Sequence, residues 1–189
     1  MAKKIPLPTI LTWFRIILVP FFVGVYYLPD SLLIMTNKNI IATAIFIFAA
    51  VTDYLDGYLA RRMNLESKFG AFLDPVADKA LVAASLVVLV NLQRTFVFAA
   101  IIIIVREIAI SALREWMAQL GEVKSVAVAY LGKLKTAFQM IAIGFLLLDY
   151  HAYMIDTNLI GNLFMLAAVI LTVVSMFYYL DQAKKHFNN

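Results

Sequence analysis

IIATAIFIFAAVTDYLDGYLAR, residues 40–61, begins as an apolar run that is interrupted only by Thr43, and it ends with two aspartates and an arginine. An apolar stretch of about 20 residues is long enough to cross a lipid bilayer as a helix. A charged side chain at the centre of such a helix costs roughly 2.5–3.5 kcal/mol on insertion scales. Asp53 and Asp56 therefore require a partner that meets their charge.

The composition of the whole chain indicates a membrane protein. Its 189 residues are 63% hydrophobic and only 15% charged, which is unlike an ordinary soluble domain. We predict an all-α integral membrane protein of six transmembrane helices, organised as one membrane-embedded domain over residues 1–189 with an interfacial segment at residues 1–9. The six apolar stretches that are long enough to span a bilayer are residues 10–28, 40–60, 70–91, 95–114, 134–150 and 158–180.

The basic residues predict the orientation of these spans. They gather at the N-terminus, after the second and fourth spans, and at the C-terminus, whereas the opposite connections hold only Lys38 and Arg94. The positive-inside rule then places both termini in the cytoplasm. Basic residues that line membrane edges argue against nucleic acid as a partner, and the absence of cysteine excludes disulfides and thiolate chemistry. The gathered basic residues are Lys3, Lys4, Arg61, Arg62, Lys68, Arg114, Lys124, Lys133, Lys135, Lys184 and Lys185.

Two further aspartates begin the third apolar stretch. Asp53 and Asp56 are three residues apart, and Asp74 and Asp78 are four apart, so each pair lies on one helix face. The two spans are antiparallel neighbours, so the pairs are expected to converge near the cytoplasmic surface. Four carboxylates cannot all stay ionised in a low dielectric without cations. Oxygen ligands suit Mg²⁺ or Mn²⁺, and two such ions would balance the four charges.

A structural interpretation of the same acids remains open. Acids inside a membrane also form proton relays, or pair with basic residues to stabilise the fold. The cations available for such pairing are Lys79, Arg106 and Arg61. Paired helical spacing, with Gly57 and Gly70 each one turn from an acid, favours the metal site, since glycine lets a bulky ligand approach the backbone.

The spacing of these residues resembles the signature of the CDP-alcohol phosphatidyltransferase family. That resemblance implies a membrane enzyme in which an acceptor hydroxyl displaces CMP from a CDP-linked lipid with the help of two divalent metal ions. It implies that all four aspartates bind metal, that Asp78 is also the general base, and that Asp56, Gly57, Ala60, Arg61 and Gly70 bind the CDP-lipid. The eight matching positions, within residues 53–78, are Asp53, Asp56, Gly57, Ala60, Arg61, Gly70, Asp74 and Asp78.

The acceptor requires cations of its own if it carries a phosphate. Arg106 and Arg114 are eight residues apart, about two helical turns, so they share a face. Glu107 is expected to point elsewhere on that helix. Lys133 and Lys135 begin the fifth span on the same membrane side, after Gly121 and Gly132, which are expected to stop helices. We predict that these four cations bind the acceptor phosphate; alternatively, Arg106 neutralises an acid of the second or third span.

Three segments resemble the family members that use sn-glycerol 3-phosphate. They are PTILTWFRIILVPFF, REIAISALREWMA and GKLKT. The resemblance implies that CDP-diacylglycerol is the donor. It also implies that the protein lies among the lipids of a bacterial cytoplasmic membrane and forms a homodimer. Many relatives carry asparagine where Thr9 stands, so the resemblance assigns no role to this position.

Other functions remain open at this point. Sister enzymes use inositol phosphate, serine or phosphatidylglycerol as acceptor. A transporter that uses the acids as an ion path is a different class, although the acids cluster near one surface and no internal repeat is visible. The third possible class is a structural membrane protein in which these acids form buried salt bridges.

Overall fold

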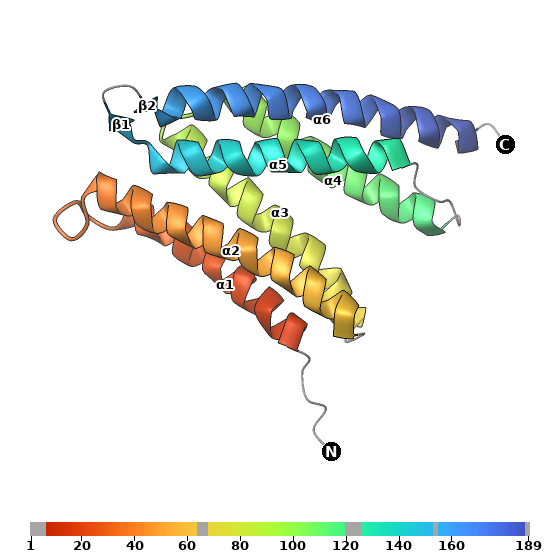
Figure 1. Ribbon diagram of the computed structural model, residues 1–189, viewed down its shortest axis with the longest axis horizontal. Helices are drawn as coiled ribbons and strands as arrows, with labels where there is room; N and C mark the ends of the chain where they lie inside the picture. Colours follow the sequence, from red (N-terminus) through yellow and green to blue (C-terminus); the bar gives the residue numbers. More distant parts are fainter. Residues whose placement is uncertain (1–6, 64–67, 120–125, 153–154, 188–189) are drawn as a thin grey trace, which may run out of the picture. The chain divides into compact units, whose positions relative to one another are not determined.

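A computed structural model describes residues 7–63, 68–119, 126–152 and 155–187 (Figure 1). Each of the six apolar stretches falls within one helix, allowing one or two residues at its ends, and a two-residue antiparallel ladder precedes the last helix. The fold is therefore all-helical apart from this ladder. The elements are α1 (Leu7–Tyr27), α2 (Met35–Met63), α3 (Lys68–Asn91), α4 (Val97–Gln119), α5 (Val126–Leu148), β1 (His151–Ala152), β2 (Ile155–Asp156) and α6 (Thr157–Phe187).

Membrane crossing is supported most directly for two helices. Among the described residues, Met35–Asp53 of α2 and Thr157–Asp181 of α6 are long and apolar enough to span a bilayer, by length and composition. Leu11–Tyr27 of α1 is a shorter apolar helix. The other helices carry charged residues within their apolar stretches, so the six-span arrangement stays a prediction.

α1 begins at Leu7, so the last three residues of the expected interfacial segment 1–9 are helical, and the interfacial position itself stays a prediction. One expected helix boundary was wrong. Gly132 was expected to stop a helix and instead lies inside α5. A Cβ at Gly132 would meet no atom within 4 Å, so nothing there requires a break in the helix. Gly121, the other expected stop, lies outside the described residues.

The chain divides into two compact units, described here one at a time. Unit 1 comprises Met1–Val88 and Leu147–Asp149, and therefore contains α1, α2 and most of α3. Ala42, Phe46 and Ala49 of α2 are buried at helical spacing, and their small members allow a close approach of α1. Phe14 of α1 meets Phe48 of α2 edge to face, with ring centroids 6.1 Å apart.

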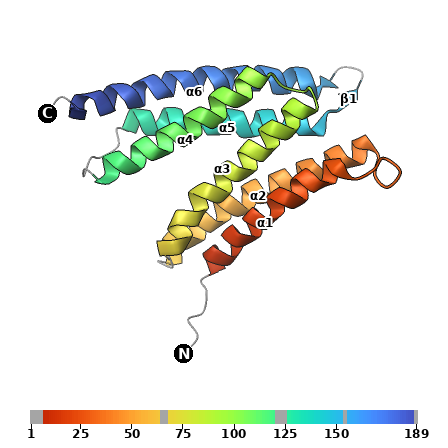
Figure 2. The same ribbon diagram turned by 180° about the vertical axis from the view of Figure 1, so that it is seen from behind.

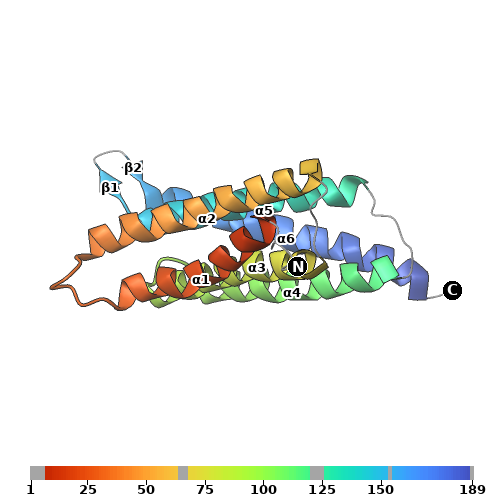
Figure 3. The same cartoon turned by 90° about the horizontal axis from the view of Figure 1, so that it is seen from below.

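Unit 2 comprises Leu89–Leu146 and Tyr150–Asn189, and it contains α4, α6 and all but the last two residues of α5. These three helices lie alongside one another in every view (Figures 1, 2 and 3). Ile110 of α4 and Tyr179 of α6 form a buried apolar contact. Gly161 of α6 faces Leu146 of α5, and only a residue without a side chain leaves room for this approach.

In unit 1, Lys38 holds the connection between α1 and α2. Its ammonium donates to the carbonyl of Leu28 at 2.6 Å and to the Asp30 carboxylate at 2.7 Å. Lys38 is 3% exposed although it lies in the first turn of α2. The ion pair with Asp30 offsets part of the cost of burying this lysine.

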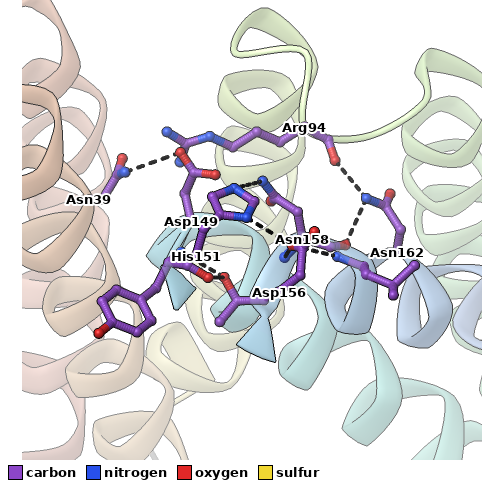
Figure 4. Close-up of polar contacts among 10 residues, drawn as sticks. Asn39, Arg94, Asp149, His151, Asp156, Asn158 and Asn162 are labelled. Carbon is purple, nitrogen blue, oxygen red and sulfur yellow. Dashed lines mark hydrogen bonds and ion pairs between the residues drawn. The ribbon is translucent and has the colours of Figure 1, made fainter. Parts of the chain in front are cut away.

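In unit 2, polar contacts fix the start of α6 (Figure 4). The Asp156 carboxylate accepts hydrogen bonds from the backbone N–H groups of Asn158, at 2.9 Å, and Leu159, at 3.1 Å, which is an N-cap. His151 lies 3.3 Å from the same carboxylate. Asn162 donates to the carbonyl of Arg94 at 3.2 Å, which links α6 to the turn before α4.

Candidate active site

The acidic signature occupies the end of α2 and the beginning of α3. Asp53 precedes the last residue of α2 by ten positions, and Asp78 follows the first residue of α3 by ten. At 1.5 Å per residue, each lies about 15 Å from the end of its helix. These two helix ends lie at the same end of unit 1 (Figure 3). The two aspartate pairs therefore lie at similar distances from these helix ends, and their convergence on one site stays a prediction.

The remaining signature positions are assigned only as helical backbone. Asp56, Gly57, Ala60 and Arg61 belong to α2, and Gly70 and Asp74 belong to α3. Their side chains lie outside the part of the chain that the structure describes. Among the side chains that it does describe, no three histidines, cysteines or acids come together as a metal-ligand set. The four-aspartate metal site stays a prediction, since two of its members are outside that comparison.

Asp53 forms an ion pair with Arg15 of α1. The structural interpretation had offered Lys79, Arg106 and Arg61 as cations for the acids, and for Asp53 the structure shows Arg15 instead. The Arg15 side chain is 2% exposed and that of Asp53 is 44% exposed, so the guanidinium is buried behind a partly accessible carboxylate. The sequence signal for this pair was an arginine inside an apolar span, which is costly without an acid.

Arg15 also changes the charge balance of the predicted metal site. Two divalent ions would balance the four aspartates exactly on the count made from the sequence. With Arg15 at Asp53, the same set carries one additional positive charge. The charge of the predicted site therefore includes a residue of α1 that the sequence analysis did not count.

Asp78 stands on the accessible side of α3. Leu73, Ala77 and Leu81 are buried at four-residue spacing and form the packed stripe of this helix. Asp78 is displaced from that stripe by one residue and is exposed. General-base catalysis would require an accessible carboxylate at this position, and that role of Asp78 stays a prediction.

Two of the four predicted acceptor-phosphate residues come together in unit 2. The Lys135 ammonium of α5 donates to Oε1 of Glu107, and the Arg106 guanidinium of α4 lies 4.0 Å from Oε2 of the same carboxylate. Lys135 is 1% exposed and Arg106 is 6% exposed. The expectation that Glu107 points elsewhere was wrong, because α5 packs where Glu107 can reach its lysine.

The other two predicted residues are not part of the described cluster. Lys133 is exposed on α5, two residues before Lys135, so it lies on a different face of the helix. Arg114 belongs to α4, but its side chain lies outside the described residues. The sequence analysis did not identify Ser175 of α6, whose hydroxyl accepts a hydrogen bond from Arg106 at 2.6 Å. A single serine in an apolar helix gives no pattern that would have revealed this contact.

Comparison with known proteins places the chain among phospholipid-synthesis enzymes. The family model for CDP-alcohol phosphatidyltransferase matches residues 5–174. A protein of Haemophilus influenzae named CDP-diacylglycerol–glycerol-3-phosphate 3-phosphatidyltransferase is 51% identical over 183 residues, 96% of this chain and 95% of that protein. Proteins of the same name from Escherichia coli K12 and Shigella flexneri are 49% and 47% identical over 180 residues, 94% of each chain.

Proposed function

We propose a specific reaction for this chain, which belongs to the CDP-alcohol phosphatidyltransferase family. It transfers the phosphatidyl group of CDP-diacylglycerol to sn-glycerol 3-phosphate, which yields phosphatidylglycerophosphate and CMP. The similarity to relatives named for this reaction carries the proposal, since it extends over 94% or more of both chains. The complete acidic signature, which lies inside the matched region, supports the same chemistry.

We propose that Asp53, Asp56, Asp74 and Asp78 hold two Mg²⁺ ions, which Mn²⁺ could replace. The donor set fits these ions, because it consists of carboxylate oxygens and because Asp53 and Asp78 are accessible on their helices. Bound ions would stabilise negative charge on the pyrophosphate and improve CMP as a leaving group. Asp56, Gly57, Ala60, Arg61 and Gly70 bind the CDP-lipid, and the glycines leave space for it beside the backbone.

Asp78 is the general base in this proposal. Its carboxylate takes the proton of the acceptor hydroxyl as that oxygen attacks the phosphorus that carries diacylglycerol. A new oxygen–phosphorus bond forms, and the bond from that phosphorus to the oxygen of CMP breaks. CMP leaves with the bonding electron pair, so the reaction balances without an additional reactant.

Arg106 and Lys135 bind the phosphate of the acceptor, with Arg114 on the same face of α4 as Arg106; Lys133, on another face of α5, is the weakest of the four candidates. The support for the first two is their burial around one carboxylate, since burying two cations in a membrane protein is costly unless anions meet them. Arginine matches a phosphate with two parallel hydrogen bonds, and lysine adds a compact positive charge.

The proposed setting is a bacterial cytoplasmic membrane. All six helices cross it, both termini and the active site face the cytoplasm, and two copies form a homodimer. The chain contains no cysteine, so single cysteines report topology without background. We expect Glu115→Cys to be protected and Asn37→Cys to react with a membrane-impermeant maleimide in intact spheroplasts; both positions are exposed. The reverse pattern would overturn the orientation.

CMP release by the purified protein tests the reaction. With CDP-diacylglycerol and Mg²⁺, we expect release with glycerol 3-phosphate and none with inositol 1-phosphate or serine. EDTA should abolish the release and excess Mg²⁺ should restore it. Release with a different acceptor would keep the reaction type and change the acceptor. If the folded protein released no CMP with any of them, the proposed function would be wrong.

A further inference from the structure

Arg106 is held in place by two residues of α6. Its guanidinium donates to the Ser175 hydroxyl at 2.6 Å, and its central carbon lies 5.8 Å from the centroid of the Tyr179 ring. Ser175 and Tyr179 are four residues apart, so they project from the same face of α6. All three residues are buried. One helix therefore provides both an oxygen and an aromatic ring for a single guanidinium.

The Ser175 hydroxyl is itself oriented by the backbone. A serine hydroxyl has one hydrogen to donate, and Ser175 donates it to the carbonyl of Thr172 at 3.0 Å. The lone pairs of its oxygen are then directed away from that carbonyl and are available to Arg106. Because Ser175 is fully buried, water does not compete for this oxygen.

These two contacts orient the guanidinium without neutralising it. A hydroxyl oxygen is uncharged, and an aromatic ring attracts a cation through its quadrupole. The carboxylate in this cluster, Glu107, lies 4.0 Å from Arg106 and also accepts a hydrogen bond from Lys135. Both cations therefore face the Glu107 carboxylate, and the planar edge of Arg106 is held at a defined angle beside it.

We propose that Ser175 and Tyr179 are positioning residues that aim Arg106 at the phosphate of the acceptor. The inference rests on the proposed function, in which Arg106 binds that phosphate. A planar guanidinium binds phosphate through two parallel bonds only when its edge is correctly oriented. α6 supplies none of the signature positions within residues 53–78, so in this proposal the helix acts on recognition of the acceptor through Arg106.

Steady-state kinetics of four variants test the inference. We expect Ser175→Ala to raise the KM for glycerol 3-phosphate by about tenfold or more, because a hydrogen bond to a charged group is lost. The KM for CDP-diacylglycerol should stay within about twofold, a range that corresponds to less than a typical hydrogen bond. Ser175→Thr keeps the hydroxyl and should retain the wild-type KM. Tyr179→Leu should raise the acceptor KM several-fold, whereas Tyr179→Phe keeps the ring and should not.

Ser85→Ala is the matched control. Ser85 is also fully buried, and its hydroxyl donates to the backbone of its own helix, at the carbonyl of Leu81, 2.8 Å away. This variant should leave both KM values unchanged. If Ser175→Ala lowered only the melting temperature, or changed both KM values equally, Ser175 would have a structural role and the inference would be wrong.

A binding measurement separates this inference from the proposed function. We expect glycerol 3-phosphate to raise the melting temperature of the wild-type protein, and Ser175→Ala to require about tenfold more of it for the same shift. If the wild type used another phosphorylated acceptor, the proposed function would fail, and the same comparison with that acceptor would test the positioning. If neither glycerol 3-phosphate nor inositol 1-phosphate shifted the melting temperature of the wild type, the positioning role would be refuted.

Discussion

Substituting Gly161 by alanine tests how closely α5 and α6 pack. A Cβ at this position would lie 2.7 Å from Cγ and 2.9 Å from Cδ2 of Leu146, and 3.2 Å from the carbonyl oxygen of Ala142. The first two distances are too short for carbon atoms, so the Leu146 side chain must move. The carbonyl belongs to the backbone of α5 and can yield only slightly. The spacing of the two helices that carry Lys135 and Ser175 depends on this contact.

The expected magnitude is a balance of two effects. Overpacking a tight contact costs about 1–3 kcal/mol. Replacing glycine by alanine inside a helix stabilises it by about 1 kcal/mol. We therefore expect Gly161→Ala to lower the free energy of unfolding by about 1 kcal/mol, which corresponds to about 2–4 °C in melting temperature for a chain of this length.

Thermal unfolding in detergent measures this effect. Gly144→Ala on α5 is the matched control, because a Cβ there would meet no atom within 4 Å, and this variant should melt at or above the wild-type temperature. In a Leu146→Ala background, Gly161→Ala should lower the melting temperature much less, because Cγ and Cδ2 of Leu146 are then absent. If Gly161→Ala raised the melting temperature as much as Gly144→Ala does, the close approach of α5 and α6 would be refuted.

Further predictions concern charged residues. Glu107→Gln should lower the free energy of unfolding by about 3 kcal/mol, because it removes the acid that meets buried Lys135. The Asp30 side chain beside Lys38 is 79% exposed, so Asp30→Asn should lower the free energy of unfolding by less than about 1 kcal/mol. Equal melting temperatures for the two variants would contradict this difference. Asp78→Asn should abolish CMP release while the protein still folds, and near wild-type turnover would exclude Asp78 as the base. Mg²⁺ should raise the melting temperature of the wild type and of the Glu107→Gln variant alike, and the absence of any shift would count against the metal site.

The helices could be predicted well from the sequence. Long apolar runs separated by polar connections have few alternatives to helix in a membrane, because the backbone must satisfy its own hydrogen bonds there. The errors lay at the ends, as with Gly132 inside α5, because a glycine can stop a helix or continue it. Which of the two occurs depends on the packing around it.

Some parts of the candidate site could be predicted from the sequence, and others could not. Asp53, Asp56, Asp74 and Asp78 could be found because their spacing matches the period of a helix on two consecutive spans. Contacts between distant segments could not be found in this way, since they depend on how whole helices pack. Arg15 and Asp53 are 38 residues apart in sequence, and Arg106 and Ser175 are 69 apart.

The sequence by itself determined the helices, the acidic signature, the family and the basic residues of α4 and α5. Each of these depends on composition or on spacing within one or two neighbouring segments, and such patterns are visible along the chain. Only the tertiary structure decided which charges meet: Arg15 with Asp53, Lys135 with Glu107, and Arg106 with the hydroxyl of Ser175. A buried charge needs a partner, but the partner is selected by the face on which two helices pack, and that face is a property of the folded molecule.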